Sequence, residues 1–319
     1  MSFLFDFRFF QQEFVRPVVT NYGVWKVRES IIVRLQNGDG KIAFGEISPL
    51  AWFGSETMEQ AINFCDQLPH EIDVNRILNI PDCLPACQFG LESALDNLRI
   101  DQKLTNYEDI NFCGLLPSGK DAINQCLRLG EQGYKTFKWK IGVEDIDTEI
   151  EIFHLLISQL SSSAKIRLDA NGGLNYHTAK LWLSICDQFS TQVEFLEQPL
   201  SVDMLTEMLE LSNFYQTKIA LDESIARLQQ LKEIYFQGWH GIFVIKPAIV
   251  GSPSRLKQFC QQHPIDLVFS SVFETEIGRK AALNLALELS NSHRALGFGI
   301  QHYFQEQNVN WLENLWNNH

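Results

Sequence analysis

The sequence contains no uninterrupted apolar run of the roughly 20 residues that a bilayer-spanning helix requires. Its first residues lack the basic segment, apolar core and small-residue cleavage site of a secretory signal. Positive charge is also scarce, because 26 Lys and Arg face 39 Asp and Glu, for a net charge of −13. A field of this sign repels nucleic acid and anionic membrane surfaces. We therefore expect a cytoplasmic protein with neither nucleic acid nor a membrane as its partner.

The seven cysteines form no CxxC pair and have no matching His spacing, so they do not resemble a zinc site. Their number is odd, and we interpret them as free thiols in a reducing compartment. Low-complexity linkers are absent as well. One α/β barrel with a smaller added domain would account for all 319 residues.

The first hundred residues indicate a small α+β domain. Two apolar-rich segments, residues 30–35 and 41–47, flank Asn37-Gly38-Asp39-Gly40, whose residues tolerate positive φ, and this predicts a β-hairpin. Apolar residues at helical spacing then predict helices over residues 55–64 and 84–98.

From residue 111 onward, short apolar strands alternate with amphipathic helices. The eight predicted strands span residues 111–116, 136–141, 165–170, 193–197, 218–222, 241–246, 267–271 and 295–299. Parallel strands need crossover helices, so the pattern predicts a (β/α)8-type barrel. The predicted fold is α/β, with an N-terminal α+β capping domain of residues 1–107 and a barrel of residues 108–319. We expect about the last 20 residues to pack back on the cap. The cap should fold over the barrel mouth and supply contacts from the loops at residues 16–26 and 50–55.

Charged residues recur at the C-terminal ends of successive predicted strands, where barrel active sites are built. They are Lys138, Lys140, Asp169, Glu197, Asp222 and Lys246. A lone acid at a strand end is usually a solvated cap, but six charges at the spacing of one β/α unit argue for a joint site. We interpret Glu194 and Glu223 as surface residues or as supports behind that site.

The alternation of a strand places Lys138 and Lys140 on one face and Trp139 on the other. The same alternation sends Asp169 and Asn171 inward. Both lysines then point into the barrel mouth, where an ammonium is costly unless it is paired or held neutral.

Three inward carboxylates on neighbouring strands would repel one another, and a divalent cation relieves that repulsion. Three hard oxygen ligands with room for water and substrate oxygens suit Mg²⁺.

A metal of this kind suits the removal of a proton next to a carboxylate. That reaction requires an electrophile for the enediolate and a nearby base, for which lysine is suitable. Lys140 and Lys246 would face each other across the mouth. A small anionic carboxylate is therefore the expected substrate.

With these residues in place, the chain resembles o-succinylbenzoate synthases of the enolase superfamily over almost its full length. The barrel motifs are Lys138-Trp139-Lys140, Arg167-Leu168-Asp169-Ala170-Asn171, Glu197-Gln198-Pro199, Leu221-Asp222-Glu223-Ser224 and Ile245-Lys246-Pro247. Two further stretches resemble the synthases in particular: Gly45-Glu46-Ile47-Ser48-Pro49-Leu50, continued at residues 53–57, and Ser270-Ser271-Val272-Phe273-Glu274-Thr275.

The resemblance implies a Mg²⁺ site, with Mn²⁺ as a substitute, whose ligands are Asp169, Glu197 and Asp222. It implies that Lys140 is the base and then the acid of a syn-dehydration, and that Lys246 stabilises the enediolate. Lys138 would assist Lys140. The implied substrate is 2-succinyl-6-hydroxy-2,4-cyclohexadiene-1-carboxylate, converted to 2-succinylbenzoate in menaquinone or phylloquinone synthesis. The expected substrate contacts are Asn171, Ser270, Ser271 and Gly297.

Two other functions are consistent with parts of this pattern. Paired lysines also serve two-base racemisation, so an N-acylamino-acid racemase or another epimerase of the superfamily is an alternative. Dipeptide epimerases usually carry an Asp-x-Asp pair on the eighth strand, and residues 298–302 contain no acid. A catalytically silent barrel that acts as a binding or structural protein is the alternative from another class, but it would have no use for the full lysine and carboxylate set.

Overall fold

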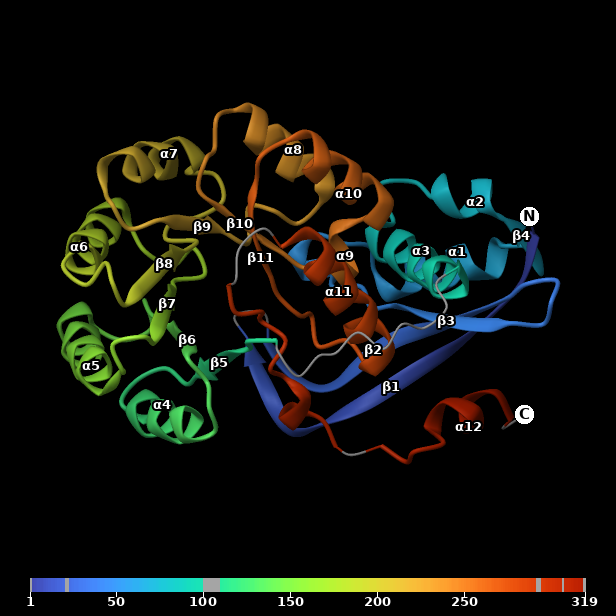
Figure 1. Cartoon of the computed structure of the whole chain (residues 1–319), viewed down its shortest axis with the longest axis horizontal. Coiled ribbons are helices and arrows are strands. Elements are labelled where there is room, and N and C mark those ends of the chain that lie inside the picture. The colour runs from blue at the N-terminus through green and yellow to red at the C-terminus, as the bar shows by residue number, and fades with distance from the viewer. Residues whose placement is uncertain (1, 21–22, 100–109, 291–293, 306, 318–319) are drawn as a thin grey trace.

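The computed structural model describes residues 2–20, 23–99, 110–290, 294–305 and 307–317. Within these residues the strands form two sheets, one antiparallel with four strands and one parallel with seven. Figure 1 shows the two sheets side by side, with helices around the outside of the parallel strands. This arrangement confirms the predicted barrel with an added α+β cap. The predicted boundary between residues 107 and 108 lies outside the described residues.

The cap is built on a sheet with strand order β3-β2-β1-β4. Its strands are β1 (Ser2–Thr20), β2 (Gly23–Gln36), β3 (Ile42–Ile47) and β4 (Glu71–Asp73), and its helices are η1 (Ala51–Phe53), α1 (Met58–Gln67), α2 (Val74–Leu78) and α3 (Pro85–Arg99). The predicted hairpin is confirmed, because β2 pairs antiparallel with β3 and Gly40 adopts a φ of 84° in the turn. The long strand β1 was not predicted.

Helix α3 packs directly on the backbone of β3. A Cβ atom at Gly45 would lie 2.0 Å from the carbonyl oxygen of Gly90, and one at Gly90 would lie 2.9 Å from the carbonyl oxygen of Glu46. Only glycine allows this approach, which brings Glu46 and the end of β3 close to the barrel.

The barrel sheet runs in the order β11-β10-β9-β8-β7-β6-β5, all parallel. Its strands are β5 (Cys113–Leu116), β6 (Thr136–Lys140), β7 (Lys165–Asp169), β8 (Val193–Glu197), β9 (Ile219–Leu221), β10 (Ile242–Ile245) and β11 (Asp266–Phe269). The helices that follow them are α4 (Asp121–Glu131), α5 (Ile146–Gln159), α6 (Tyr176–Asp187), α7 (Leu205–Phe214), α8 (Leu228–Phe236), α9 (Pro247–Val250), α10 (Pro253–Gln262) and α11 (Glu276–Leu289).

At the eighth barrel position the structure has less strand pairing than predicted. Instead of a strand over residues 295–299, the described residues there form two isolated bridges, from Leu296 to Phe112 and from Gly297 to Ser270. The first bridge joins this segment to the residue before β5 and the second joins it to the residue after β11. The segment therefore lies between the first and seventh strands, where the eighth strand was expected.

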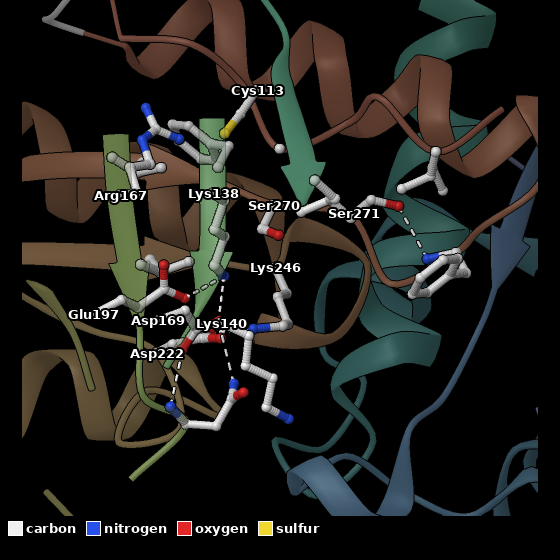
Figure 2. A pocket seen from close by; sticks show the side chains of 18 of the residues that line it. Cys113, Lys138, Lys140, Arg167, Asp169, Glu197, Asp222, Lys246, Ser270 and Ser271 are labelled. Atoms are coloured by element: carbon white, nitrogen blue, oxygen red, sulfur yellow. Dashed lines mark hydrogen bonds and ion pairs between the residues drawn. The ribbon is translucent and has the colours of Figure 1, made fainter. Parts of the chain in front are cut away.

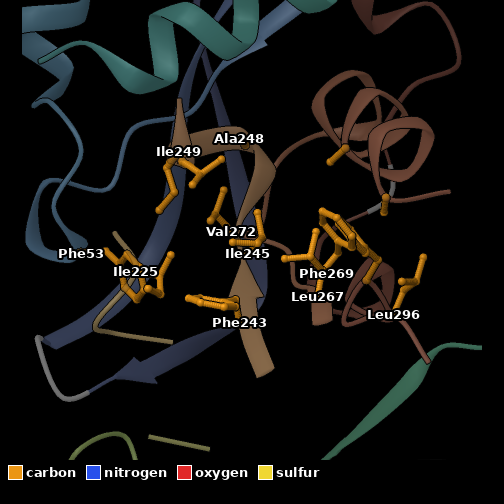
Figure 3. Close-up of a cluster of buried hydrophobic side chains, with 14 of the residues drawn as sticks. Phe53, Ile225, Phe243, Ile245, Ala248, Ile249, Leu267, Phe269, Val272 and Leu296 are labelled. Atoms are coloured by element: carbon orange, nitrogen blue, oxygen red, sulfur yellow. The ribbon is translucent and has the colours of Figure 1, made fainter. Parts of the chain in front are cut away.

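Strand β10 shows why the barrel strands are continuous apolar runs in the sequence. All four of its residues are buried, because the pleat sends alternate side chains to opposite faces and both faces are covered. Ile242 and Val244 belong to a small cluster inside the barrel. Phe243 and Ile245 belong to the main hydrophobic core, where Figure 3 shows Phe243 near Ile225 and Ile245 near Val272.

The C-terminal segment returns to the cap. It contains η2 (Gln301–Tyr303) and α12 (Trp311–Asn317), and α12 lies beside β1 in Figure 1. The ring centroids of Trp311 and Phe10 are 4.5 Å apart, and the indole Nε1 of Trp316 donates to Asp6 Oδ2 at 3.2 Å. Among the described residues, no helix is both long and apolar enough to cross a membrane.

Candidate active site

The predicted charged residues stand where the parallel strands end. Lys140, Asp169 and Glu197 are the last residues of β6, β7 and β8, while Asp222 and Lys246 directly follow β9 and β10. Register places three of them at one level, because Lys140 pairs with Asp169 and Asp169 pairs with Glu197. Asp222 lies two residues beyond Ala220, the partner of Glu197. The strand geometry alone therefore gathers these groups in the barrel mouth.

The alternation along β6 has the predicted outcome. Trp139 is fully buried on the outer side, where its ring meets Trp182 edge to face at 6.3 Å. Lys138 and Lys140 point the other way, and both line a cavity of about 370 Å³ at the mouth (Figure 2).

All ten predicted site residues line this one cavity. They are Lys138, Lys140, Asp169, Asn171, Glu197, Asp222, Lys246, Ser270, Ser271 and Gly297. The structure thus brings together every residue that the sequence singled out, while the role of each residue stays a prediction.

Lys138 is the centre of a buried ion-pair cluster. Its Nζ lies 2.7 Å from Asp169 Oδ2 and 2.7 Å from Glu197 Oε1. Burial lowers the pKa of Lys138, but the charges of Asp169, Glu197 and Asp222 outweigh it, and the net pKa is well above the ordinary value. The neighbouring carboxylates therefore favour the charged form of Lys138.

The carboxylates face lysines rather than one common point. Asp169 and Glu197 contact Lys138, and Asp222 forms an ion pair with Lys246. Within the part of the chain that the structure describes, no three His, Cys, Asp or Glu side chains converge on a metal position.

The charge balance at this cluster nevertheless fits a divalent cation. Glu197 is only 2% exposed, and burial, followed by the charge of Asp169, raises its pKa well above the ordinary value even though Lys138 opposes the shift. Lys138 therefore does not offset the cost of ionising Glu197, a cost that a bound divalent cation would lower. Three buried carboxylates in this state form a hard oxygen donor set of the kind that Mg²⁺ prefers.

Strained backbone surrounds the site. The non-glycine residues with positive φ in the described ranges are Asn171, Gln198 and Phe273, at 44°, 34° and 62°. Asn171 donates from Nδ2 to Asp169 Oδ2 at 3.2 Å, and the side-chain oxygen of Gln198 accepts from the backbone N–H of Asp222 at 3.1 Å. These unfavourable conformations are retained at positions that orient two of the acids.

Neither of the two acids interpreted as surface residues or supports is fully exposed. Glu223 lines the cavity and accepts from Asn171 Nδ2 at 3.1 Å, and burial together with Asp222 and Asp169 raises its pKa to about 7. Glu194 lies deeper in the barrel, where its oxygens accept from Arg167 Nε at 2.7 Å and from Arg294 at 2.8 Å.

Sequence reasoning named no individual cavity residue of the cap or the C-terminal segment. Val18, Trp52 and Phe53 come from the cap, Ile300 and Tyr303 come from the C-terminal segment, and Phe273 joins them from the loop after β11. The sequence did predict contacts from residues 16–26 and 50–55, and Val18, Trp52 and Phe53 agree with that, although residues 21–22 lie outside the described ranges. The individual residues could not be identified from the sequence, because these contacts exist only once the cap is docked on the barrel.

The seven cysteines are free thiols, as predicted. Cys113 lines the cavity wall near Arg167, and burial raises its pKa above the ordinary value. An un-ionised thiol is a weak nucleophile, so Cys113 serves packing rather than chemistry.

Comparison with known proteins agrees with this geometry. Residues 8–98 match the family model described as MenC, N-terminal domain, and residues 121–315 match Enolase C-terminal domain-like. The o-succinylbenzoate synthase of Thermosynechococcus vestitus is 36% identical over 302 residues, which cover 93% of this chain and 92% of that protein. The chain belongs to the o-succinylbenzoate synthase family of the enolase superfamily. The synthase of Pasteurella multocida is 28% identical over 82% of this chain and 78% of its own length.

A solved structure of an o-succinylbenzoate synthase shares the whole architecture. The synthase from Thermosynechococcus elongatus BP-1, complexed with Mg in its active site, superposes with a TM-score of 0.90 at 34% identity, covering 99% of this chain and 100% of that one. The L-Ala-D/L-Glu epimerase of Bacillus subtilis reaches a TM-score of 0.80 at 20% identity, covering 97% of this chain and 92% of that one, and shows a common fold alone.

Proposed function

We propose that this chain is an o-succinylbenzoate synthase, a hydro-lyase of menaquinone or phylloquinone synthesis. The observation that carries the proposal is one cavity in which lysines from β6 and the end of β10 flank three carboxylates. The 36% identity over most of the chain supports the same activity. The substrate is 2-succinyl-6-hydroxy-2,4-cyclohexadiene-1-carboxylate, and the product is 2-succinylbenzoate.

Asp169, Glu197 and Asp222 would hold Mg²⁺, with Mn²⁺ as a substitute. Bound Mg²⁺ supplies positive charge to the substrate carboxylate as the enediolate develops. The lysines that now face these acids are the second source of positive charge. Lys138 forms ion pairs with Asp169 and Glu197, and Lys246 approaches from the end of β10, four strands away from β6.

Lys140 is the proposed base. Its amine removes the proton next to the ring carboxylate, and the electrons of the broken C–H bond enter an enediolate whose charge the Lys246 ammonium stabilises. Lys140 then returns the proton to the departing hydroxyl on the same face, so the C–O bond breaks and water leaves. The ring becomes aromatic, which favours the forward direction.

Asn171, Ser270, Ser271 and Gly297 are the proposed substrate contacts beyond the reacting carbon. Ser271 is held in place by its own hydrogen bond, since its Oγ donates to Glu274 Oε2 at 2.8 Å. The cap encloses the other side of the cavity with aromatic and aliphatic side chains, and this excludes water from the enediolate. The net negative charge argues against nucleic acid or an anionic membrane as a partner, whereas the cavity lysines suit a small carboxylate. The free thiols support a cytoplasmic location.

N-acylamino-acid racemisation is the second candidate, favoured by the two lysines at different sides of one cavity. Purified protein with Mg²⁺ and the cyclohexadiene substrate should produce the absorbance of the aromatic product. An N-acylated amino acid in deuterated water tests racemisation in parallel through deuterium incorporation. Absence of dehydration with rapid deuterium exchange would replace the proposed activity by racemisation, and absence of both would indicate a catalytically silent barrel.

A further inference from the structure

A phenyl ring of the cap lies against a lysine of the barrel. The Nζ of Lys246 is 4.0 Å from the centroid of the Phe53 ring. Phe53 ends the short helix η1 and is only 9% exposed, and Figure 3 shows it among buried side chains of the barrel. A cation at this distance from a ring face is attracted by the ring quadrupole.

The ring and Asp222 together determine where the ammonium lies. Asp222 forms an ion pair with Lys246, whose side chain is only 12% exposed. An ammonium has three N–H donors, and an aromatic face attracts its charge without accepting a conventional hydrogen bond. Phe53 can therefore fix the position of Nζ while the donors that Asp222 does not use stay available to a substrate.

The loop that carries Phe53 is fastened to the barrel beside Asp222. The Nε of Arg227 donates to the carbonyl oxygen of Gly54 at 2.6 Å. Gly54 has a φ of 119°, and a Cβ there would lie 2.6 Å from the Cβ of Ala226. The turn is closed from within the cap by the backbone N–H of Leu50, which donates to Ser55 Oγ at 2.7 Å.

We propose that Phe53 is a positioning residue for Lys246, through which docking of the cap sets the lysine for catalysis. The inference rests on the proposed function, because it assumes that the Lys246 ammonium stabilises the enediolate. It assigns the cap a part in the chemical step itself, in addition to enclosing the cavity.

The test replaces Phe53 by 4-fluoro-, 3,5-difluoro- and 3,4,5-trifluorophenylalanine in the full chain with Mg²⁺. Fluorine weakens the negative potential of the ring face while leaving its shape nearly unchanged. We expect kcat for dehydration to fall stepwise, by about 3- to 30-fold at the trifluoro ring, with little change in KM. Phe53→Tyr, which keeps the ring face, should retain more activity than Phe53→Leu.

Phe14 offers a matched control. It is buried, its ring lies 5.6 Å from Phe273 and 4.9 Å from Phe304, and it is not among the residues that line the cavity. The same fluorinated series there should leave kcat unchanged. A flat series at Phe53 in an active enzyme, an effect on KM alone, or an equal slope at Phe14 would overturn the positioning role. If the unsubstituted chain performs no dehydration, the proposed function fails and this inference fails with it.

Discussion

Glu46 of the cap accepts a hydrogen bond from the backbone N–H of Thr275, immediately before α11 of the barrel, at 3.0 Å. Its other oxygen accepts from the backbone N–H of Gly278 at 2.9 Å and contacts the Thr275 hydroxyl. Glu46 is 1% exposed, so a carboxylate from one part of the molecule caps a helix of the other. Arg28 supports the same junction by donating to the carbonyl oxygens of Val272 and Ser48.

Glu46→Gln should therefore destabilise the protein. The amide keeps one acceptor but turns an NH2 group toward backbone donors, and we expect the free energy of unfolding to fall by about 1 to 3 kcal/mol. Urea denaturation measures the loss. Glu131→Gln, at an exposed position of α4, is the control and should change stability by less than about 0.5 kcal/mol. Equal effects of the two changes would refute the interdomain cap.

The three carboxylates should act as one metal site. Glu197→Gln, Asp169→Asn and Asp222→Asn should each lower kcat/KM by about 10³-fold or more, because each removes an anionic ligand. Calorimetric titration with Mg²⁺ should show weakened binding, while circular dichroism should show cooperative unfolding. Near-normal turnover and Mg²⁺ affinity in Glu197→Gln would contradict the assignment.

Substitution by arginine should affect Lys140 and Lys246 differently. Guanidinium stays protonated at any relevant pH, so Lys140→Arg should be inactive, whereas Lys246→Arg can still offer a cation and should keep measurable dehydration. The measurement is kcat/KM of both variants on the cyclohexadiene substrate. Lys246→Ala shows whether the larger arginine merely blocks the cavity. Equal collapse of the two arginine variants would favour two-base racemisation.

The deep ion pair of Glu194 should make stability depend on pH. Burial raises the pKa of Glu194, but Arg167 and Arg294 outweigh it, so the net pKa lies below the ordinary value of 4.5. The stabilisation is therefore complete above the unfolded pKa and is lost as pH falls through the lower folded pKa. At pH 7, Glu194→Gln should lower the free energy of unfolding by about 3 kcal/mol.

Urea denaturation at pH 7, 5 and 4 tests this sign. The difference between the unsubstituted protein and Glu194→Gln should shrink toward acid, because protonated glutamic acid and glutamine both leave Arg167 without its carboxylate partner. The exposed Glu131→Gln again serves as control. A difference that is the same at pH 4 and pH 7 would show that Glu194 does not act through its charge.

Much of the site could be predicted because strand geometry is local. The period of two in β6 determines that Lys138 and Lys140 point inward and Trp139 outward, and parallel register aligns Asp169 with Glu197. These relationships need only the sequence spacing of each β/α unit.

The remainder depends on contacts between distant segments. In β1 the apolar alternation begins with buried Phe3 and Phe5 but is lost further along, where Phe10 is covered by Trp311 of the C-terminal segment. Where the packing partner of a strand comes from the other end of the chain, the apolar residues of that part of the strand do not alternate regularly. The contact of Phe53 with Lys246 is invisible for the same reason, since it follows from docking of the cap.

The two bridges at the eighth barrel position give the ring of strands a seam. In the described residues a few backbone hydrogen bonds join its two sides. The N–H of Leu296 donates to the carbonyl oxygen of Asn111 at 2.8 Å, and the N–H of Gly297 donates to that of Phe269 at 2.8 Å. Amide hydrogen–deuterium exchange is governed by such local opening, so these amides should exchange before those of β7, which is paired on both sides. Ser270 and Gly297 border both the seam and the cavity. A ligand held between them would therefore slow exchange of the amides on both sides of the seam.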